Sequence, residues 1–403
     1  MPRVLLITAN LGSLFDDLGR LSQRWLEYMA KTVHSQAADF VAIHLQETGG
    51  KRFEENSDKV VPLIWKLHEG LRDQFEHCYA FLDIDFTISE QFTALGSVFF
   101  VRSSIKDKVQ IFDFKKRVFE PLGEAGLYVE PSINSSNRIR KEKFSRDFWP
   151  GVRWGRKGYM HSRWAVDGNI LDLINLHLFH DESNLAFHEN PFQYSQNRRK
   201  AMNYMLQRYD EFAKSTKTEG SANLFLFGDF NFRLNAISFL KKLTKHASEH
   251  TLETLSDSDS PKNSSDDSDT VLINGHPILD RQLSAIEYRR DDENCVLRIE
   301  KKKFEYENSK NLLSNWREYK EDDQEPRDLP LKELPVSFPP TYPWSEDPLN
   351  HNLLTNTRMP AWCDRILMNP TAFSALSNPI YTSIGMDLCM GDHKPVILAF
   401  DLP

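Results

Sequence analysis

FLFGDFNFR, residues 225–233, runs three apolar side chains into Gly228 and then alternates Asp229, Asn231 and Arg233 with phenylalanine. In an extended backbone, residues two apart point to the same face, so Asp229 and Asn231 are expected to lie side by side. Glycine, aspartate and asparagine also favour an ordinary turn after a strand. In layered α/β folds, however, polar groups just beyond strand ends form ligand sites. The other strand ends of the chain decide between these interpretations.

Short apolar, β-branched runs recur along the chain and predict further buried strands. They lie at 4–10, 40–46, 95–101, 170–178, 224–228, 365–368 and 395–400. Amphipathic patterns at 21–36 and 195–214 predict helices between some of these strands, and the run 109–119 favours a hairpin. Strands interspersed with helices and hairpins predict an α/β layered fold with mixed sheets.

The composition is that of a protein with a substantial core. The chain has 403 residues, of which 40% are hydrophobic and 12% aromatic. One segment differs, because residues 256–270 consist almost entirely of serine and aspartate and predict a mobile surface insertion. It lies between strands that carry reactive residues, so we expect a single catalytic domain spanning residues 1–403.

Charge and cysteine content narrow the function further. The formal net charge of −8 argues against a general nucleic-acid binder, although a pocket can still attract a small anion. The four cysteines are scattered without a C-x-x-C pair, which predicts neither a zinc site nor a disulfide framework. No apolar stretch approaches the roughly 18 residues of a membrane span. We therefore expect a cytoplasmic monomer.

The polar residues at the predicted strand ends have the chemistry of metal-assisted phosphate hydrolysis. They are Asn10, Glu47, His177, Asp229, Asn231, Asp392 and His393. Each alone is compatible with a structural role. Together, Glu47 and Asn10 offer the hard oxygen ligands that Mg²⁺ prefers, and Asp229 is placed to deprotonate or orient water.

Histidines and amides complete this predicted set. Asp392 is expected to fix the tautomer of His393. Asn231 and His177 are expected to donate hydrogen bonds to the phosphoryl oxygens as charge develops on them.

The stretch RMPAWCDRIL, residues 358–367, adds two guanidinium groups around a proline-containing turn. Arg358 and Arg365 have the planar fork that suits phosphate, while Arg365 is equally compatible with a structural ion pair. Trp362 is expected in the core, and Cys363 is expected to be a packed thiol rather than a nucleophile.

The combination of GDFNFR with RMPAWCDRIL resembles the paired signature of the inositol polyphosphate 5-phosphatases. The order of the strand-end residues resembles the wider exonuclease–endonuclease–phosphatase superfamily. Further stretches resemble the type I branch in particular: HLQETGG (44–50), FTALGS (92–97), NLHLFHDESN (175–184) and FPPTYPWSED (338–347). The similarity runs nearly end to end, with an interruption at the Ser/Asp insertion.

The resemblance implies a four-layer sandwich, with two mixed β-sheets packed face to face and helices on the outside. It implies Mg²⁺-dependent removal of the 5-phosphate from the soluble substrates inositol 1,4,5-trisphosphate and inositol 1,3,4,5-tetrakisphosphate, which terminates a calcium signal. By position, it assigns Asn10 and Glu47 to the metal and Asp229 to water activation. Asn231, His177, Asp392 and His393 would complete the catalytic set. Arg358 would hold the neighbouring 4-phosphate, with Tyr342 alongside.

Two positions depart from the family pattern. Pro343 and Asn356 stand where most of the wider family carries lysines, so other cations must face the 4-phosphate. The expected replacements and further substrate contacts are Arg156, Lys157, Arg163, Arg365 and Lys394. Type I members often end in a prenylation box, whereas the printed sequence ends in AFDLP. Peripheral association with the plasma membrane is therefore expected only if a lipidated tail lies beyond it.

Three alternatives stay open at this stage. Asp83-x-Asp85-x-Thr87 matches the aspartyl-nucleophile pattern of haloacid-dehalogenase-like phosphatases. A nuclease or phosphodiesterase of the same superfamily would share the core residues, and so would a non-catalytic inositol-phosphate-binding protein. Arg233 is expected to form a structural ion pair near the site.

Overall fold

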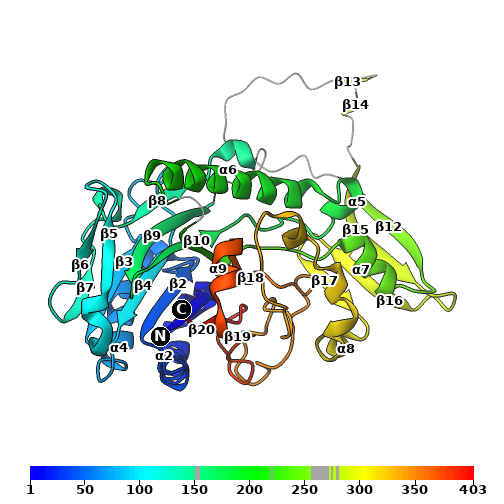
Figure 1. The fold of residues 1–403 in the computed structure, drawn as a ribbon. Coiled ribbons are helices and arrows are strands. Elements are labelled where there is room, and N and C mark those ends of the chain that lie inside the picture. The colour runs from blue at the N-terminus through cyan, green and yellow to red at the C-terminus, as the bar shows by residue number, and fades with distance from the viewer. Residues whose placement is uncertain (150–154, 219–220, 256–271, 274–275, 278–280) are drawn as a thin grey trace.

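Two seven-stranded mixed β-sheets form the centre of the molecule (Figure 1). The computed structural model describes residues 1–149, 155–218, 221–255, 272–273, 276–277 and 281–403, and the Ser/Asp-rich segment 256–270 lies outside these ranges. In spatial order the first sheet contains β19 (Ser377–Ser383), β20 (Val396–Asp401), β1 (Arg3–Asn10), β2 (Phe40–Gln46), β4 (Gly96–Val101), β3 (His77–Leu82) and β7 (Gly126–Val129). The second contains β18 (Asp364–Met368), β11 (Asn223–Asp229), β10 (Asn169–His177), β9 (Gly158–Val166), β5 (Val109–Asp113) and β6 (Val118–Pro121), with β8 (Arg140–Lys143) paired to β9.

The two sheets pack face to face through buried aromatic and aliphatic side chains. Phe40 on β2 meets Trp164 on β9 with ring centroids 5.4 Å apart. Phe225 on β11 stacks on Phe400 on β20 at 5.2 Å. All four rings are buried and belong to one hydrophobic core between the sheets. Since alternate residues of each strand face opposite sides, the other side chains of these strands are left for helices to cover.

Helices cover the two outer faces and complete four layers. The amphipathic helix α2 (Leu18–Ser35) packs on the first sheet together with α4 (Val60–Glu69), and Trp25 of α2 is buried there. The long helix α6 (Gln193–Ser215) lies across the second sheet, at the top of Figure 1, and buries Met205. The predicted four-layer α/β sandwich is confirmed.

The remaining elements lie around this sandwich. The other helices are α1 (Gly12–Asp16), α3 (Phe53–Asn56), α5 (Ala186–Glu189), α7 (Ala236–Leu243), α8 (Ser309–Ser314) and α9 (Pro370–Ala375), with short 3₁₀ turns η1 (Ser57–Lys59), η2 (Ser103–Lys108), η3 (Ile133–Ser135), η4 (Arg146–Phe148), η5 (Trp316–Glu318), η6 (Lys320–Asp322) and η7 (Glu325–Asp328). In the described part of the chain, no helix is both long enough and apolar enough to span a membrane.

A small four-stranded antiparallel sheet projects to one side, at the right of Figure 1. It contains β12 (Ser248–Leu255), β15 (Arg281–Arg289), β16 (Cys295–Glu300) and β17 (Lys303–Tyr306), and a short pair, β13 (Leu272–Ile273) and β14 (His276–Pro277), lies between β12 and β15 in the chain. No apolar run predicts this sheet, because its strands alternate apolar with charged side chains, as in Ile286-Glu287-Tyr288.

Strand register brings the predicted site residues together. β1 and β2 run parallel, and so do β10 and β11, with His177 opposite Asp229 at their ends. The carboxyl ends of parallel strands meet at one edge of a sheet, and face-to-face packing brings the two edges together. Asn10, at the end of β1, reaches this edge from the first sheet.

Candidate active site

Four strand-end residues form one cluster at the junction of the two sheets. The Asn10 amide Nδ2 donates to Asp229 Oδ2 at 3.0 Å, a hydrogen bond that crosses from β1 to β11. His177 Nε2 lies 3.3 Å from the same carboxylate oxygen and 3.6 Å from Glu47 Oε1. Residues far apart in the sequence therefore share a space of a few ångströms, as their strand-end positions predicted.

Asp229 is ionised and tightly held. It is 1% exposed, and its Oδ1 accepts a hydrogen bond from the backbone N–H of Asn231 at 2.9 Å. Burial alone would raise its pKa, but the nearby His393, His177 and Lys157 hold the pKa of this carboxyl well below its usual range. Burial and the charge of Lys157 lower the pKa of His177, while the carboxylates of Asp229 and Glu47 act in the other direction.

Glu47 and Asn10 present oxygens to one small space beside Gly12. A Cβ added to Gly12 would lie 2.8 Å from Glu47 Oε2 and 3.3 Å from Asn10 Oδ1, so both oxygens border the volume that this glycine leaves open. Burial would raise the pKa of Glu47, but the charges of Lys157 and His177 outweigh it and lower the pKa to about 2. An ionised carboxylate and an amide oxygen fit a hard divalent cation.

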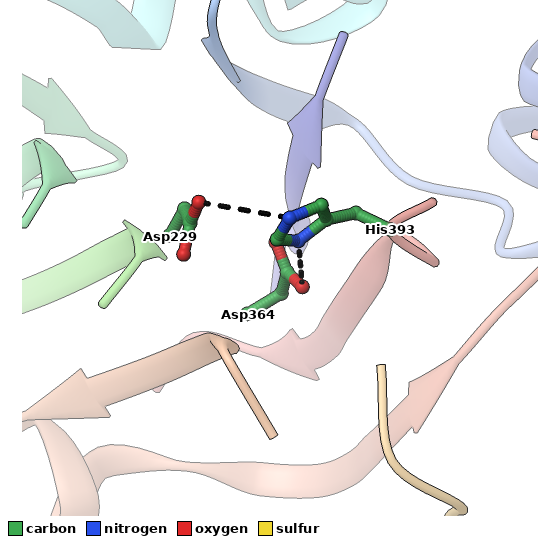
Figure 2. Close-up of side chains that lie close together, drawn as sticks. All are labelled: Asp229, Asp364 and His393. Carbon is green, nitrogen blue, oxygen red and sulfur yellow. Dashed lines mark hydrogen bonds and ion pairs between the residues drawn. The ribbon is translucent and has the colours of Figure 1, made fainter. Parts of the chain in front are cut away.

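His393 is oriented by Asp364 and not by Asp392. His393 Nδ1 lies 2.9 Å from Asp364 Oδ2, and its Nε2 lies 4.0 Å from Asp229 Oδ2, so the ring stands between two carboxylates (Figure 2). The predicted pairing with Asp392 is wrong, since Asp392 Oδ1 accepts from the Ser13 hydroxyl at 2.7 Å. Burial would lower the pKa of His393, but Asp364 and Asp229 raise it to about 10.

The same three residues are close enough to hold a metal ion. One ligand atom from each of Asp229, Asp364 and His393 lies within 4.8 Å of the others. However, each nitrogen of the His393 ring faces a carboxylate, and the raised pKa keeps the ring protonated at neutral pH. A protonated imidazole has no lone pair for a metal. The triad is therefore better described as a hydrogen-bonded imidazolium, and the Glu47–Asn10 space fits a cation better.

Asn231 is held in one amide orientation. Its Nδ2 donates to the Leu178 carbonyl at 3.0 Å, and its Oδ1 accepts from Arg233 Nη2 at 2.7 Å. A carbonyl only accepts and a guanidinium only donates, so the two contacts fix which end of the amide is which. One of the two amide hydrogens remains for a phosphoryl oxygen.

Two of the predicted cationic replacements lie at this cluster. Lys157 Nζ is hydrogen-bonded to His177 Nε2 and lies 3.9 Å from Glu47 Oε1. Burial lowers the pKa of Lys157, although the carboxylate of Glu47 acts in the other direction. Arg156 donates to the Gly50 carbonyl at 2.8 Å and lies 3.9 Å from Glu47 Oε2. Both cations therefore stand beside the expected path of an anionic substrate.

Arg358 and Tyr342 lie next to the catalytic residues. The ring of Tyr342 is 4.7 Å from that of His393, and burial raises the pKa of its phenol to about 12. Arg358 donates to Asn184 Oδ1 at 2.9 Å and to the Lys301 carbonyl at 2.8 Å. Arg358 also lines a cavity of about 170 Å³ together with Arg233, which is two residues beyond Asn231.

Three predicted substrate contacts are structural instead. Arg163 forms a two-point ion pair with Asp172 at 2.7 and 2.6 Å beneath α6. Arg365 pairs with Glu333 at 2.7 and 2.6 Å, as its alternative interpretation allowed. Lys394 donates to two backbone carbonyls, at 2.9 and 2.5 Å. All three are at most 2% exposed. Their nitrogens donate to groups of the protein itself, so the prediction that they bind substrate is wrong.

The residues of the aspartyl-nucleophile motif do not form an active site. Asp83 is buried, pairs with Lys141 at 2.9 Å and accepts hydrogen bonds from Thr93. Asp85 is exposed and accepts from Thr87. The first carboxylate of the motif is neutralised by a lysine and the second faces solvent, so the two do not form a phosphoryl-transfer site.

Sequence reasoning missed Asp364 and gave Arg233 the wrong partner. Asp364 pairs in register with Asp229 across β11 and β18, and this register is the signal that would have found it. The ion pair expected for Arg233 is absent, since no carboxylate of the described residues pairs with its guanidinium.

Comparisons with known proteins identify relatives of this chain. The chain matches the family described as Endonuclease/Exonuclease/phosphatase family 2 over residues 18–274 and 285–399. It is 44% identical to a Caenorhabditis elegans protein named "Probable type I inositol 1,4,5-trisphosphate 5-phosphatase", with 100% of both chains covered. It is 36% identical to human "Inositol polyphosphate-5-phosphatase A", covering 98% of this chain and 92% of that one. Among solved structures, it is 14% identical to the 5-phosphatase domain of a synaptojanin in complex with inositol (1,4)-bisphosphate and calcium ion, with a TM-score of 0.47 and coverage of 99% and 83%.

Proposed function

This chain belongs to the inositol polyphosphate 5-phosphatases of Endonuclease/Exonuclease/phosphatase family 2, and we propose that it removes the 5-phosphate from inositol 1,4,5-trisphosphate and inositol 1,3,4,5-tetrakisphosphate. As a phosphoric monoester hydrolase acting on these messengers, it would terminate a calcium-releasing signal. The observation that carries the proposal is the junction cluster, in which Asn10, Glu47 and His177 converge on Asp229.

The residues of the cluster divide the work of phosphate hydrolysis. Asp229 orients the attacking water; with a pKa far below neutral it is a weak proton acceptor, so orientation is its larger contribution. Asn231 and His177 donate hydrogen bonds to the scissile phosphate. His393, protonated and held by Asp364, presents positive charge where negative charge develops on the phosphoryl oxygens.

Mg²⁺ is the cofactor that we propose, and Glu47 and Asn10 are the residues that would hold it. Their oxygens border the space beside Gly12, and oxygen-only ligands favour Mg²⁺ over the softer transition metals. When bound, the ion supplies charge neutralisation for the phosphoryl oxygens. Lys157 and Arg156 lie next to Glu47 and extend the positive field toward the substrate.

The neighbouring 4-phosphate is assigned to Arg358 with Tyr342 alongside. Arg358 has no carboxylate partner among the described residues and makes its hydrogen bonds to Asn184 Oδ1 and to carbonyls. It therefore forms no ion pair within the described part of the chain. A guanidinium in this state suits a phosphate.

We further propose that residues 1–403 act as one catalytic domain that works as a cytoplasmic monomer on soluble inositol phosphates. The net charge of −8 supports a substrate other than nucleic acid. Peripheral membrane association would need a lipidated tail beyond the printed residues.

Phosphate release measured with Mg²⁺ tests the function directly. We expect turnover of inositol 1,4,5-trisphosphate, slower turnover of the matching lipid in micelles, and none of abasic DNA. The D229N variant should lose most of the rate, by about 10²- to 10⁴-fold. Faster hydrolysis of the lipid would refute the type I assignment, and cleavage of the DNA would favour the nuclease alternative. Binding of the trisphosphate without turnover would favour a non-catalytic protein.

A further inference from the structure

Arg233 is a buried cation that forms no ion pair with a carboxylate of the described residues. Its Nη2 donates to Asn231 Oδ1 at 2.7 Å, and its guanidinium lies 4.8 Å from the centre of the Tyr342 ring. No group of the described residues accepts a hydrogen bond from the buried Nε or Nη1. Buried donors without partners are costly, and a charged donor more so. An ion pair would remove this cost, so its absence among the described residues needs a physical reason.

The charges around the adjoining cavity show that Arg233 is not alone in this state. Four arginines and three carboxylates line the cavity of about 170 Å³. Arg198 contacts two of the carboxylates, and Arg199 contacts the third. Arg233 and Arg358 therefore remain as the two lining cations without a carboxylate partner among the described residues. Two uncompensated guanidinium groups facing one cavity form a site for an anion.

The two arginines also act on each other. Burial and then the charge of Arg233 lower the pKa of Arg358, so the two guanidinium charges repel each other, while Tyr342 and Asp181 act on this pKa in the other direction. An anion between them would relieve this repulsion as well as supply acceptors. Both effects would be absent from an ordinary structural arginine, such as Arg365 with its two carboxylates.

We infer that Arg233 binds the phosphate next to the one that is hydrolysed, jointly with Arg358, and links that phosphate to the catalytic residues through Asn231. The inference rests on the proposed function and adds a residue to its 4-phosphate subsite. Arg233 stands between the two halves of the site, since its Nη2 fixes the amide of Asn231 and its guanidinium covers Tyr342.

The test compares two substrates that differ only at the neighbouring position. Inositol 1,4,5-trisphosphate carries the 4-phosphate, and inositol 1,5-bisphosphate lacks it. Replacing Arg233→Met removes the charge at similar length, and should lower kcat/KM for the trisphosphate by about 10- to 100-fold, the usual effect of losing a charged hydrogen bond. For the bisphosphate only the orientation of Asn231 is lost, so the fall in kcat/KM should be at least about 3-fold smaller. Arg199→Met is the matched control, since Arg199 lines the same cavity but pairs with Asp328. It should leave kcat/KM for both substrates unchanged.

Equal losses on the two substrates would overturn the inference, because Arg233 would then act only by orienting Asn231. No loss on either would overturn it as well. If Arg233→Met fails to fold, Arg233→Lys retains the charge without the planar fork and should show a smaller loss that is again larger for the trisphosphate than for the bisphosphate. A wild-type protein that hydrolyses neither substrate would instead refute the proposed function, an outcome visible before any variant is made.

Discussion

Gly12→Ala should weaken Mg²⁺ binding while leaving the fold intact. Gly12 is the first residue of helix α1, and alanine is a good helix former, so the backbone tolerates the change. The new Cβ would lie 2.8 Å from Glu47 Oε2, although ordinary contacts of this kind begin at 3.4 Å. The carboxylate oxygen must therefore retreat by about 0.6 Å, which a flexible side chain can do without disturbing the backbone.

That retreat is large on the scale of metal coordination. Ligand distances in metal sites hold to within about 0.2 Å, and disturbing the positions of ligands typically costs 10- to 100-fold in metal affinity. We expect the Mg²⁺ concentration for half-maximal phosphate release to rise by about that factor, with the maximal rate at saturating Mg²⁺ less affected.

The assay is a Mg²⁺ titration of trisphosphate hydrolysis, combined with thermal unfolding of each variant. Gly19→Ala is the matched control, because a Cβ at Gly19 in helix α2 meets nothing within 4 Å. It should leave the Mg²⁺ titration unchanged. A folded Gly12→Ala protein with the Mg²⁺ dependence of the wild type would refute the placement of the metal at Glu47 and Asn10.

Asp364→Asn should lower the pKa of His393 from about 10 and move the alkaline limb of the pH–rate profile to lower pH. An NMR titration of the ring checks this, and an unchanged titration would contradict the pairing of His393 with Asp364. Arg365→Met should destabilise the protein by about 3–5 kcal/mol in chemical denaturation, since carboxylates such as Glu333 lose their counter-charge. The folded fraction should retain full kcat, and a stable protein with low kcat would restore Arg365 to the substrate site. Burial lowers the pKa of His44 to about 3, below its ordinary 6.5. The stability that the buried neutral ring contributes is therefore fully present above pH 6.5 and is lost as pH falls toward 3. Between pH 6.5 and 5.5 the wild type should lose about 1 kcal/mol more than His44→Gln in urea denaturation, and equal losses would contradict this.

The central strands were predictable because they are buried on both faces. Runs such as 40–46 and 224–228 are almost wholly apolar, and they coincide with β2 and β11. The small sheet β12–β15–β16–β17 was not predictable in this way, since one of its faces carries charge and its apolar residues alternate. Strand ends then located Asn10 and Glu47, because the position of a residue beyond a buried strand is a property of the sequence itself.

Side-chain partners were harder to predict, because they depend on register and on local turns. Arg163 looked like a substrate contact from its distance to Lys157 in the sequence, but it lies opposite Asp172 in the β9–β10 ladder. The prediction that Asp229 and Asn231 lie side by side is correct, but an extended backbone is not the reason. The strand ends at Asp229, and Asn231 has φ of +52°, so a turn closed by its N–H on the carboxylate joins them.

The site depends on the packing of the two sheets as much as on either sheet alone. Glu47 and Asn10 come from the first sheet, and Asp229 comes from the second, so the predicted metal ligands and the water-orienting carboxylate meet only when the sheets are face to face. The Asn10–Asp229 hydrogen bond is the direct link and uses the amide nitrogen, while the amide oxygen accepts from the Gly12 N–H at 2.9 Å and keeps a second lone pair. One asparagine therefore orients the carboxylate with one atom and offers a metal ligand with the other. Aspartate in its place would have the oxygen but not the donor, and would bring a second negative charge against Asp229. This is a physical reason for an amide, rather than a carboxylate, at the end of β1.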